Sequence, residues 1–257
     1  MAIKVRAPTL VLYYPAVLII AAISSLVAVL VPSYYALLPE LILFMLFIYV
    51  LTKLRRGLGI GYSYIAVITL IVLISYASVF LIRPGLILSR ALIEMRQSVV
   101  RGFIYVIIYL FASLLPDSAT DLAGTLPIFI FVTAIAVLEL RLRYYLLAGV
   151  LTGIIGIGVS TIILSLMYNR VIATYGLSAM TMGLMGAVLM SSLINTVKGP
   201  VRPVHALNFL IILYTVYESL WLLIPIPPVL VVDGVGINRL GHFISFLAGV
   251  IIAIFIT

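Results

Sequence analysis

Long apolar runs separated by short polar segments make up nearly the whole chain of 257 residues. A helix needs about 17–25 predominantly apolar residues to cross the ~30 Å hydrocarbon core of a bilayer. Because no water there can satisfy the backbone, such runs must be helical, and a β-barrel would need an alternation of apolar and polar residues that these runs lack. The predicted spans are residues 9–31, 34–52, 62–82, 126–140, 144–167, 177–197, 204–224 and 240–257.

A further apolar stretch, residues 103–115, is short and follows a series of arginines. Whether it crosses the bilayer decides which way every later helix faces. Basic residues mark cytoplasmic loops, and those near Arg55, Arg141 and Lys198 agree with one another only if this stretch does not cross fully. We therefore expect about eight crossings with both termini inside, and residues 83–125 as an outer loop with membrane-embedded helices. The alternative of nine crossings violates more of the loop charges.

Composition supports the membrane class and removes one alternative. Hydrophobic residues make up 65% of the chain and charged residues 9%, whereas a soluble domain has about half and a quarter. The net charge of +8 could suit nucleic acid, but the basic residues lie between apolar runs and are better interpreted as topology signals and contacts to anionic lipid. We expect a multi-pass integral protein of the cell membrane whose partner is the lipid bilayer, with no nucleic acid.

Several intramembrane chemistries are excluded by the residues present. The chain has no cysteine, which removes thiol nucleophiles, disulfides and Cys-ligated metal. It has no HExxH motif for zinc, no aspartate within a predicted span to form an acid pair, and no adjacent glutamate pair. We therefore expect no metal and no cofactor, and serine with histidine remains as the candidate chemistry.

Two segments place a serine and a histidine at matching depths. Ser178 follows Gly176, which frees the turn into its helix, so the serine falls in the first turn of a span. His242 lies about one turn into the last span. At 1.5 Å per residue each side chain sits roughly 5 Å below its helix entrance. Both helices start from the same side, because one full span and its return separate them. If they are neighbours, a nucleophile lies beside a base, as acyl transfer requires.

These segments resemble the active-site helices of the rhomboid family of intramembrane serine proteases. Gly176-x-Ser178 with the small Ala179, followed by Gly-Leu-Met-Gly-Ala at residues 183–187, is similar to the family's serine helix, and residues 241–249 are similar to its final helix. Weaker similarities are Glu-Leu-Arg-Leu-Arg at residues 139–143, like the end of the second core helix, and Arg-Gly-Phe at residues 101–103, like an element of the first outer loop.

The resemblance covers residues 62–257 and implies a rhomboid-like six-helix core, with about two extra N-terminal transmembrane helices in residues 1–61. The predicted fold class is therefore all-α, a polytopic membrane helix bundle. Because the chain shows no long polar tail or linker, we expect no soluble domain.

The resemblance also implies an activity, that of a serine endopeptidase cleaving transmembrane-segment substrates near the outer leaflet. Ser178 would attack the carbonyl, His242 would take and return the proton, and Gly176 and Ala179 would support the turn and the oxyanion. Its partners would be transmembrane protein substrates. Two alternatives stay open: a proteolytically inactive rhomboid-like protein that binds membrane clients, and a small-solute transporter.

The sequence departs from the family at several positions. Ala179 and Ser245 stand where glycine is usual, and Val100 stands in place of a tryptophan. The family's second core helix carries a His-x-x-x-Asn pair that supports the oxyanion, and the matching region, about residues 123–131, has neither residue. The loss of one oxyanion donor typically lowers the rate by ~10²–10³, so an active enzyme needs backbone N–H groups or another donor.

A transmembrane substrate would have to reach Ser178 sideways. The loop at residues 225–238 contains three prolines, with Gly234 and Gly236, and this composition predicts irregular backbone. We expect this loop and the span at residues 204–224 to form the mobile gate.

The other polar residues and the glycines have structural interpretations. Glu139 should pair with a nearby arginine or with loop backbone, and Glu218 should be a satisfied interior carboxyl. His205 and Asn208, at the inner end of their span, should be interface residues or a loop brace. The glycines concentrated between residues 149 and 186 have a spacing that lets helix backbones approach closely.

Overall fold

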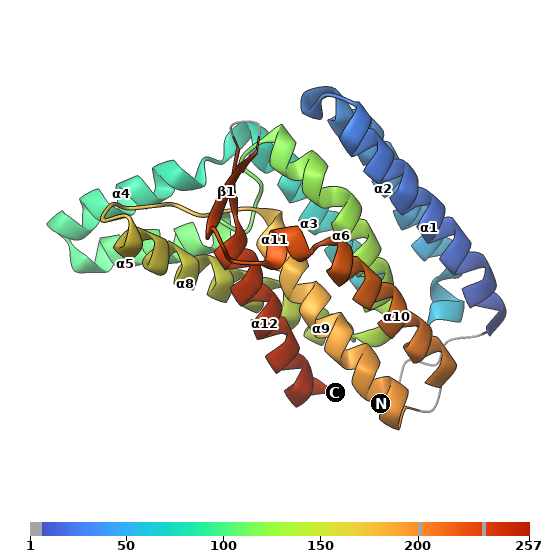
Figure 1. Ribbon diagram of the computed structural model, residues 1–257. Helices are drawn as coiled ribbons and strands as arrows, with labels where there is room; N and C mark the ends of the chain where they lie inside the picture. The colour runs from blue at the N-terminus through green and yellow to red at the C-terminus, as the bar shows by residue number, and fades with distance from the viewer. Residues whose placement is uncertain (1–6, 200–201, 233–234) are drawn as a thin grey trace.

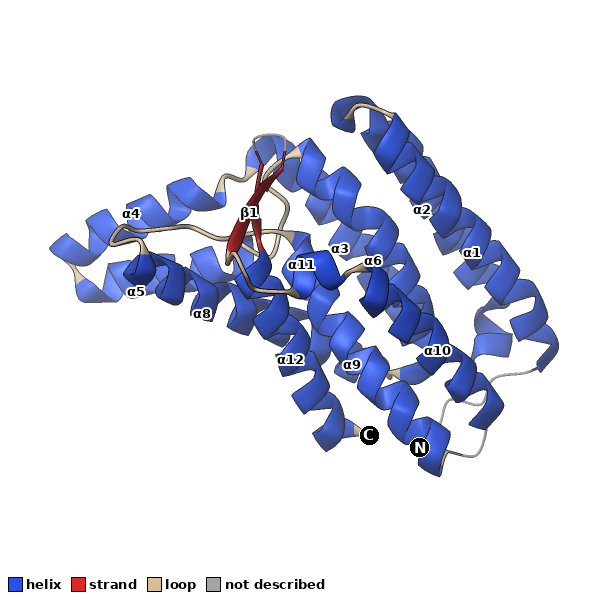
Figure 2. Ribbon diagram, viewed as in Figure 1, coloured by secondary structure: helices blue, strands red, loops and turns tan. Residues whose placement is uncertain are grey.

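The computed structural model describes residues 7–199, 202–232 and 235–257, most of which form α-helices (Figures 1 and 2). Within these residues, seven segments are long and apolar enough to cross a membrane. This agrees with the predicted all-α, multi-pass helix bundle. The seven are α1 (Ala7–Leu30), α2 (Ser33–Leu58), α3 (Tyr62–Leu81), α6 (Ala119–Glu139), the continuous segment Leu142–Met167, α9 (Leu177–Lys198) and α12 (Arg239–Ile256).

The predicted span at residues 204–224 is divided into two helices. α10 (Arg202–Glu218) has 17 residues, and after Ser219 the chain forms the short α11 (Leu220–Leu223). α10 packs along α9. At 1.5 Å per residue it extends ~26 Å, less than the ~30 Å of hydrocarbon, and it is not one of the seven candidate spans.

Two further helices form a hairpin beside the bundle. α4 (Pro84–Gln97) and α5 (Val99–Ala112) have 14 residues each and pack against one another, projecting away from α1 and α2 (Figure 1). Fourteen residues are too few to cross a bilayer. This agrees with the expectation that the apolar stretch at residues 103–115 does not cross fully.

The loop before α12 contains regular structure, contrary to the prediction of irregular backbone. β1 (Val229–Val232) and β2 (Val235–Asn238) pair as an antiparallel hairpin, with Val229 opposite Asn238. The valines explain the difference, because β-branched residues favour strands. Of the described residues in this loop, those that lack helix and strand are the proline-containing residues 224–228.

The first two helices pack against α6. The hydroxyl group of Tyr13, in α1, donates to the carbonyl oxygen of Ala134 at 2.8 Å, which ties α1 to the middle of α6. The side chain of Tyr13 is almost fully buried. The division of the chain between residues 61 and 62 stays a prediction.

The segment Leu142–Met167 consists of α7 (Leu142–Leu146), a π-helical turn (Leu147–Leu151) and α8 (Thr152–Met167). Two glycines bring it close to α9. A β-carbon added to Gly149 would lie 2.8 Å from the Cε of Met180, and one added to Gly153 would lie 3.3 Å from the Cα of Met180. The predicted close approach at these glycines is confirmed.

α9 lies at the centre of the bundle, in contact with α6, α8, α10 and α12. Its contact with α12 is made backbone to backbone. A β-carbon on Gly186 would lie 2.1 Å from the carbonyl oxygen of Phe246, and one on Gly249 would lie 2.0 Å from that of Gly183. Such distances leave no room for a side chain, so these glycines set the spacing of the two helices.

We therefore expect Gly249→Ala to lower the free energy of unfolding by about 1–3 kcal/mol, the usual cost of overpacking. Thermal unfolding of the purified protein in detergent measures this. Gly124→Ala in α6 is the matched control, because a β-carbon there meets nothing within 4 Å and alanine favours a helix. Equal unfolding temperatures for the two variants would contradict the tight contact between α9 and α12.

Candidate active site

The turn into α9 requires a glycine. Gly176 has φ +133° and ψ 142°, a region that residues with a β-carbon rarely adopt. Its N–H group donates to the carbonyl oxygen of Ser113 at 2.8 Å, which fixes the turn to the end of α5. α9 begins at the next residue, so Ser178 lies in its first turn, as predicted.

α12 begins with a capped first turn that positions His242. The side chain of Asn238 accepts a hydrogen bond from the N–H group of Gly241 at 2.9 Å, and its amide donates to the Oγ of Ser160, in α8, at 2.8 Å. An asparagine cap of this kind stabilises a helix start. His242 therefore has a fixed position one turn below the β-hairpin.

The structure brings the two predicted residues together. α9 and α12 are neighbours (Figure 1), and the Nε2 of His242 lies 2.8 Å from the Oγ of Ser178. His242 is 5% exposed, and Ser178 is partly buried. In the neutral tautomer with its proton on Nδ1, His242 accepts a hydrogen bond from the Ser178 hydroxyl group, the arrangement of a nucleophile with its base.

The other ring nitrogen of His242, Nδ1, is not held by a strong hydrogen bond. Within the part of the chain that the structure describes, Nδ1 is buried without a hydrogen bond of good geometry. The backbone of Leu222, in α11, lies within reach of a weak hydrogen bond to the imidazole. No carboxylate hydrogen-bonds to this nitrogen among the described residues, so the arrangement is a dyad.

The backbone around Gly176 and Ala179 supports the turn. The N–H group of Ala179 donates to the carbonyl oxygen of Gly176 at 3.3 Å, and that of Gly176 is bonded to Ser113. Both groups are therefore occupied. The N–H groups of Leu177 and Ser178 make no hydrogen bond to any described residue, as expected for the first turn of a helix, and these are the backbone donors available to an oxyanion.

An aspartate that the sequence analysis did not select lies beside the dyad. The expectation that no aspartate lies within a span was wrong, because α6 begins at Ala119 and includes Asp121. A β-carbon on Gly176 would lie 2.9 Å from the Oγ of Ser178 and 3.1 Å from the Oδ2 of Asp121. The two side chains therefore border the same small volume.

A local signal for this helix start is present in the sequence. Ser118-Ala-Thr-Asp121 has the spacing of a capping motif ahead of an apolar run. In the structure the Oγ of Ser118 accepts from the N–H group of Asp121 at 3.2 Å. The apolar run alone placed the beginning of the span at Leu126, seven residues later than the observed helix.

A tyrosine in the loop before α9 adds a neutral polar group next to this region. Burial, together with the negative charge of Asp117, raises the pKa of Tyr175 to about 12. The phenol of Tyr175 therefore stays protonated over the physiological range. It can act as a hydrogen-bond donor but not as a base.

A second polar cluster lies at the opposite end of α6. The carboxyl group of Glu139 accepts hydrogen bonds from the amides of Asn195 and Asn208 and lies 2.9 Å from the Nδ1 of His205. The sequence analysis expected interface residues or a loop brace here; in the structure His205 and Asn208 join α10 to the end of α6. Glu218, expected to be an interior carboxyl, is exposed.

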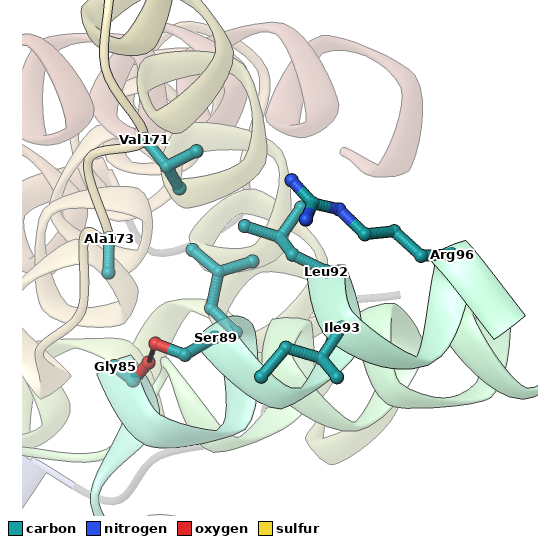
Figure 3. Close-up of a pocket in the computed structure, with 8 residues that line it drawn as sticks. Gly85, Ser89, Leu92, Ile93, Arg96, Val171 and Ala173 are labelled. Atoms are coloured by element: carbon teal, nitrogen blue, oxygen red, sulfur yellow. Dashed lines mark hydrogen bonds between the residues drawn. The ribbon is translucent and has the colours of Figure 1, made fainter.

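A cavity lies away from the dyad. It has a volume of about 380 Å³ and is formed between α4 and the loop from α8 to α9, with Arg96 at one end (Figure 3). Neither Ser178 nor His242 lines it. Figure 3 shows Gly85, Ser89, Leu92, Ile93, Val171 and Ala173 around it.

Comparisons of the chain with models of protein families, with curated proteins and with solved structures found no match. Function must therefore be derived from the site. Among the residues that the structure describes, no three His, Asp or Glu side chains gather where they could hold a metal ion. The dyad with its neighbouring carboxyl group is the arrangement most capable of chemistry.

Proposed function

We propose that the protein is a rhomboid-type intramembrane serine endopeptidase. The observation that supports this best is the 2.8 Å contact between the Oγ of Ser178 and the Nε2 of His242. The two residues come from the first turns of adjacent candidate spans. A serine paired with a histidine base is the core of serine-hydrolase chemistry.

The reaction has two halves. The Oγ of Ser178 attacks the peptide carbonyl carbon while His242 takes the hydroxyl proton on Nε2, and the carbonyl electron pair moves to oxygen. The tetrahedral intermediate collapses, the C–N bond breaks, and His242 gives its proton to the leaving nitrogen. A water molecule then attacks the acyl-serine ester, giving a proton to His242, which returns it to Ser178 as the ester bond breaks.

The beginning of α9 supplies stabilisation for the negatively charged intermediate. The N–H groups of Leu177 and Ser178 have no partner among the described residues, and the positive end of the helix dipole lies at the same place. Preorganised donors of this kind are worth most in a site that excludes water. Backbone groups can therefore replace part of the His-x-x-x-Asn pair that the sequence lacks.

The position of the dyad favours substrates that are themselves membrane spans. Ser178 is the second residue of α9 and His242 the fourth of α12. Both lie within one helical turn, ~5 Å, of their helix starts, a depth at which a substrate helix can unwind next to the membrane surface. The distribution of loop charges favours the outer side for this surface. The break in the helix at Ser219 and the following β-hairpin lie where a gate for sideways access is expected.

Two observations favour a second candidate function. The residues of α6 include no His-x-x-x-Asn pair, and Nδ1 of His242 makes no hydrogen bond of good geometry to the described residues. A dyad that lacks these supporting groups would react slowly. This is what we expect of a protein that binds membrane clients without cleaving them. The reactivity of Ser178 distinguishes the two candidates.

A fluorophosphonate probe tests the proposal directly. On the folded protein in detergent and again in lipid vesicles, we expect covalent labelling of Ser178, found by mass spectrometry of the modified peptide, and no labelling of Ser178→Ala. Circular dichroism on the same samples reports whether the helices are intact. A folded protein that stays unlabelled in both environments would favour the client-binding candidate.

A further inference from the structure

The absence of a side chain at Gly176 leaves a small space beside the nucleophile. A β-carbon there would lie 2.9 Å from the Oγ of Ser178, 3.1 Å from the Oδ2 of Asp121 and 3.4 Å from its Oδ1. A carbonyl group attacked by Ser178 must lie within about 3 Å of that oxygen. The carboxyl group of Asp121 therefore borders one of the places that the substrate carbonyl can occupy.

The carboxyl group of Asp121 is held in a defined orientation. Its backbone N–H group is bound to the Ser118 cap, and its Oδ1 accepts a hydrogen bond from the Oγ1 of Thr125, one turn later, at 3.3 Å. Its Oδ2 is buried and has no hydrogen-bond partner in the described part of the chain. Because Oδ1 already accepts, Oδ2 is the oxygen on which an acid proton can reside.

The surroundings of Asp121 favour the neutral acid. No basic side chain of the described residues forms an ion pair with it, and a nearby second carboxyl group, that of Asp117, adds a like charge. The nearby Tyr175 is a neutral phenol, so it does not offset a negative charge on Asp121. An unpaired carboxylate in an apolar site is costly to bury, and the group avoids this by keeping its proton.

We propose that Asp121 is a third catalytic residue, a neutral carboxylic acid whose Oδ2–H group donates a hydrogen bond to the oxyanion formed when Ser178 attacks. This rests on the proposed protease function. The proton stays on Asp121 throughout, so the acid stabilises charge without entering the proton transfer between Ser178 and His242. A carboxylic acid kept neutral by an apolar site can act as an oxyanion donor.

The same carboxyl group could instead act as an anion and bind a basic substrate side chain. The two roles predict opposite results for Asp121→Asn. Asparagine keeps an N–H donor at nearly the same position but cannot carry a negative charge. It should therefore preserve an oxyanion donor and remove a site for a cation.

The test measures kcat and KM for cleavage of a transmembrane substrate by the full chain in lipid vesicles. For Asp121→Ala we expect kcat to fall by about 10²–10³, the effect of losing one oxyanion donor, with KM nearly unchanged because the hydrogen bond strengthens only in the transition state. Asp121→Asn should recover kcat to within about 10-fold of the unmodified protein. Gly124→Ala, in the same helix, is the control, because a β-carbon there meets nothing within 4 Å, and it should leave kcat unchanged.

Each alternative gives a different result. Asp121→Ala with unchanged kcat would overturn the donor role, as would Asp121→Asn that is as slow as Asp121→Ala while both unfold at the normal temperature. A rise in KM confined to substrates with a basic residue near the cleaved bond would show the anionic role instead. If the unmodified protein neither cleaves nor reacts with a fluorophosphonate, the protease function itself fails, and the inference on Asp121 fails with it.

Discussion

Replacing Ser178 or His242 by alanine should reduce cleavage of a transmembrane substrate to the uncatalysed background, a loss of about 10⁴-fold or more. In the proposed mechanism Ser178 supplies the attacking oxygen and His242, 2.8 Å away, removes its proton. Because nucleophile and base act as one unit, the double variant should be no slower than either single variant. Release of a fluorophore from a labelled substrate in lipid vesicles measures all three.

Ser192→Ala is the matched control for the serine variant. Ser192 lies in the same helix, α9, and its buried hydroxyl group has no hydrogen-bond partner among the described residues. Its removal should therefore leave both folding and cleavage unchanged. Cleavage by Ser178→Ala at the rate of the Ser192→Ala variant would exclude the dyad as the source of activity.

The dyad could be predicted from the sequence because local signals fix both of its residues. Gly176 sets the start of one helix and Asn238 caps the other, so each functional side chain falls in a first turn. The pattern of spans then placed the two helix starts on one side of the membrane. Only the contact between α9 and α12 was left to the structure, and the glycines at positions 186 and 249 explain it.

Asp121 could not be found by the same reasoning, because apolar runs locate the hydrocarbon part of a helix and not its beginning. α6 continues for seven residues before the apolar run at Leu126 and starts at the Ser118 cap. The position of Asp121 next to Gly176 also depends on the packing of α6 on α9, a contact between distant segments. The hydropathy pattern also did not predict the break in the helix at Ser219 or the strands β1 and β2. Both depend on the conformational preferences of a few adjacent residues.

The polar cluster at Glu139 shows the same limit. Its members come from α6, α9 and α10, and no spacing along the chain relates them. The sequence analysis expected Glu139 to pair with a nearby arginine or with loop backbone. In the structure Asn195, His205 and Asn208 surround its carboxyl group, so the residue joins three helices at the end of the bundle opposite to the dyad.

Glu139→Ala should therefore lower the free energy of unfolding by about 3–5 kcal/mol, the usual effect of removing one partner from a buried pair. The Glu139 side chain is 0% exposed, and its loss leaves two amides and an imidazole without their acceptor. Thermal unfolding in detergent measures the change.

Two further variants show whether the loss belongs to the hydrogen bonds. Glu139→Gln keeps one acceptor oxygen and should lie between the unmodified protein and Glu139→Ala, because only part of the network is broken. Glu218→Ala, on the exposed side of α10, should change the free energy of unfolding by less than about 0.5 kcal/mol. If Glu139→Ala unfolds at the temperature of Glu218→Ala, the cluster does not join the three helices, and the close packing of α9 must hold α10 in place without it.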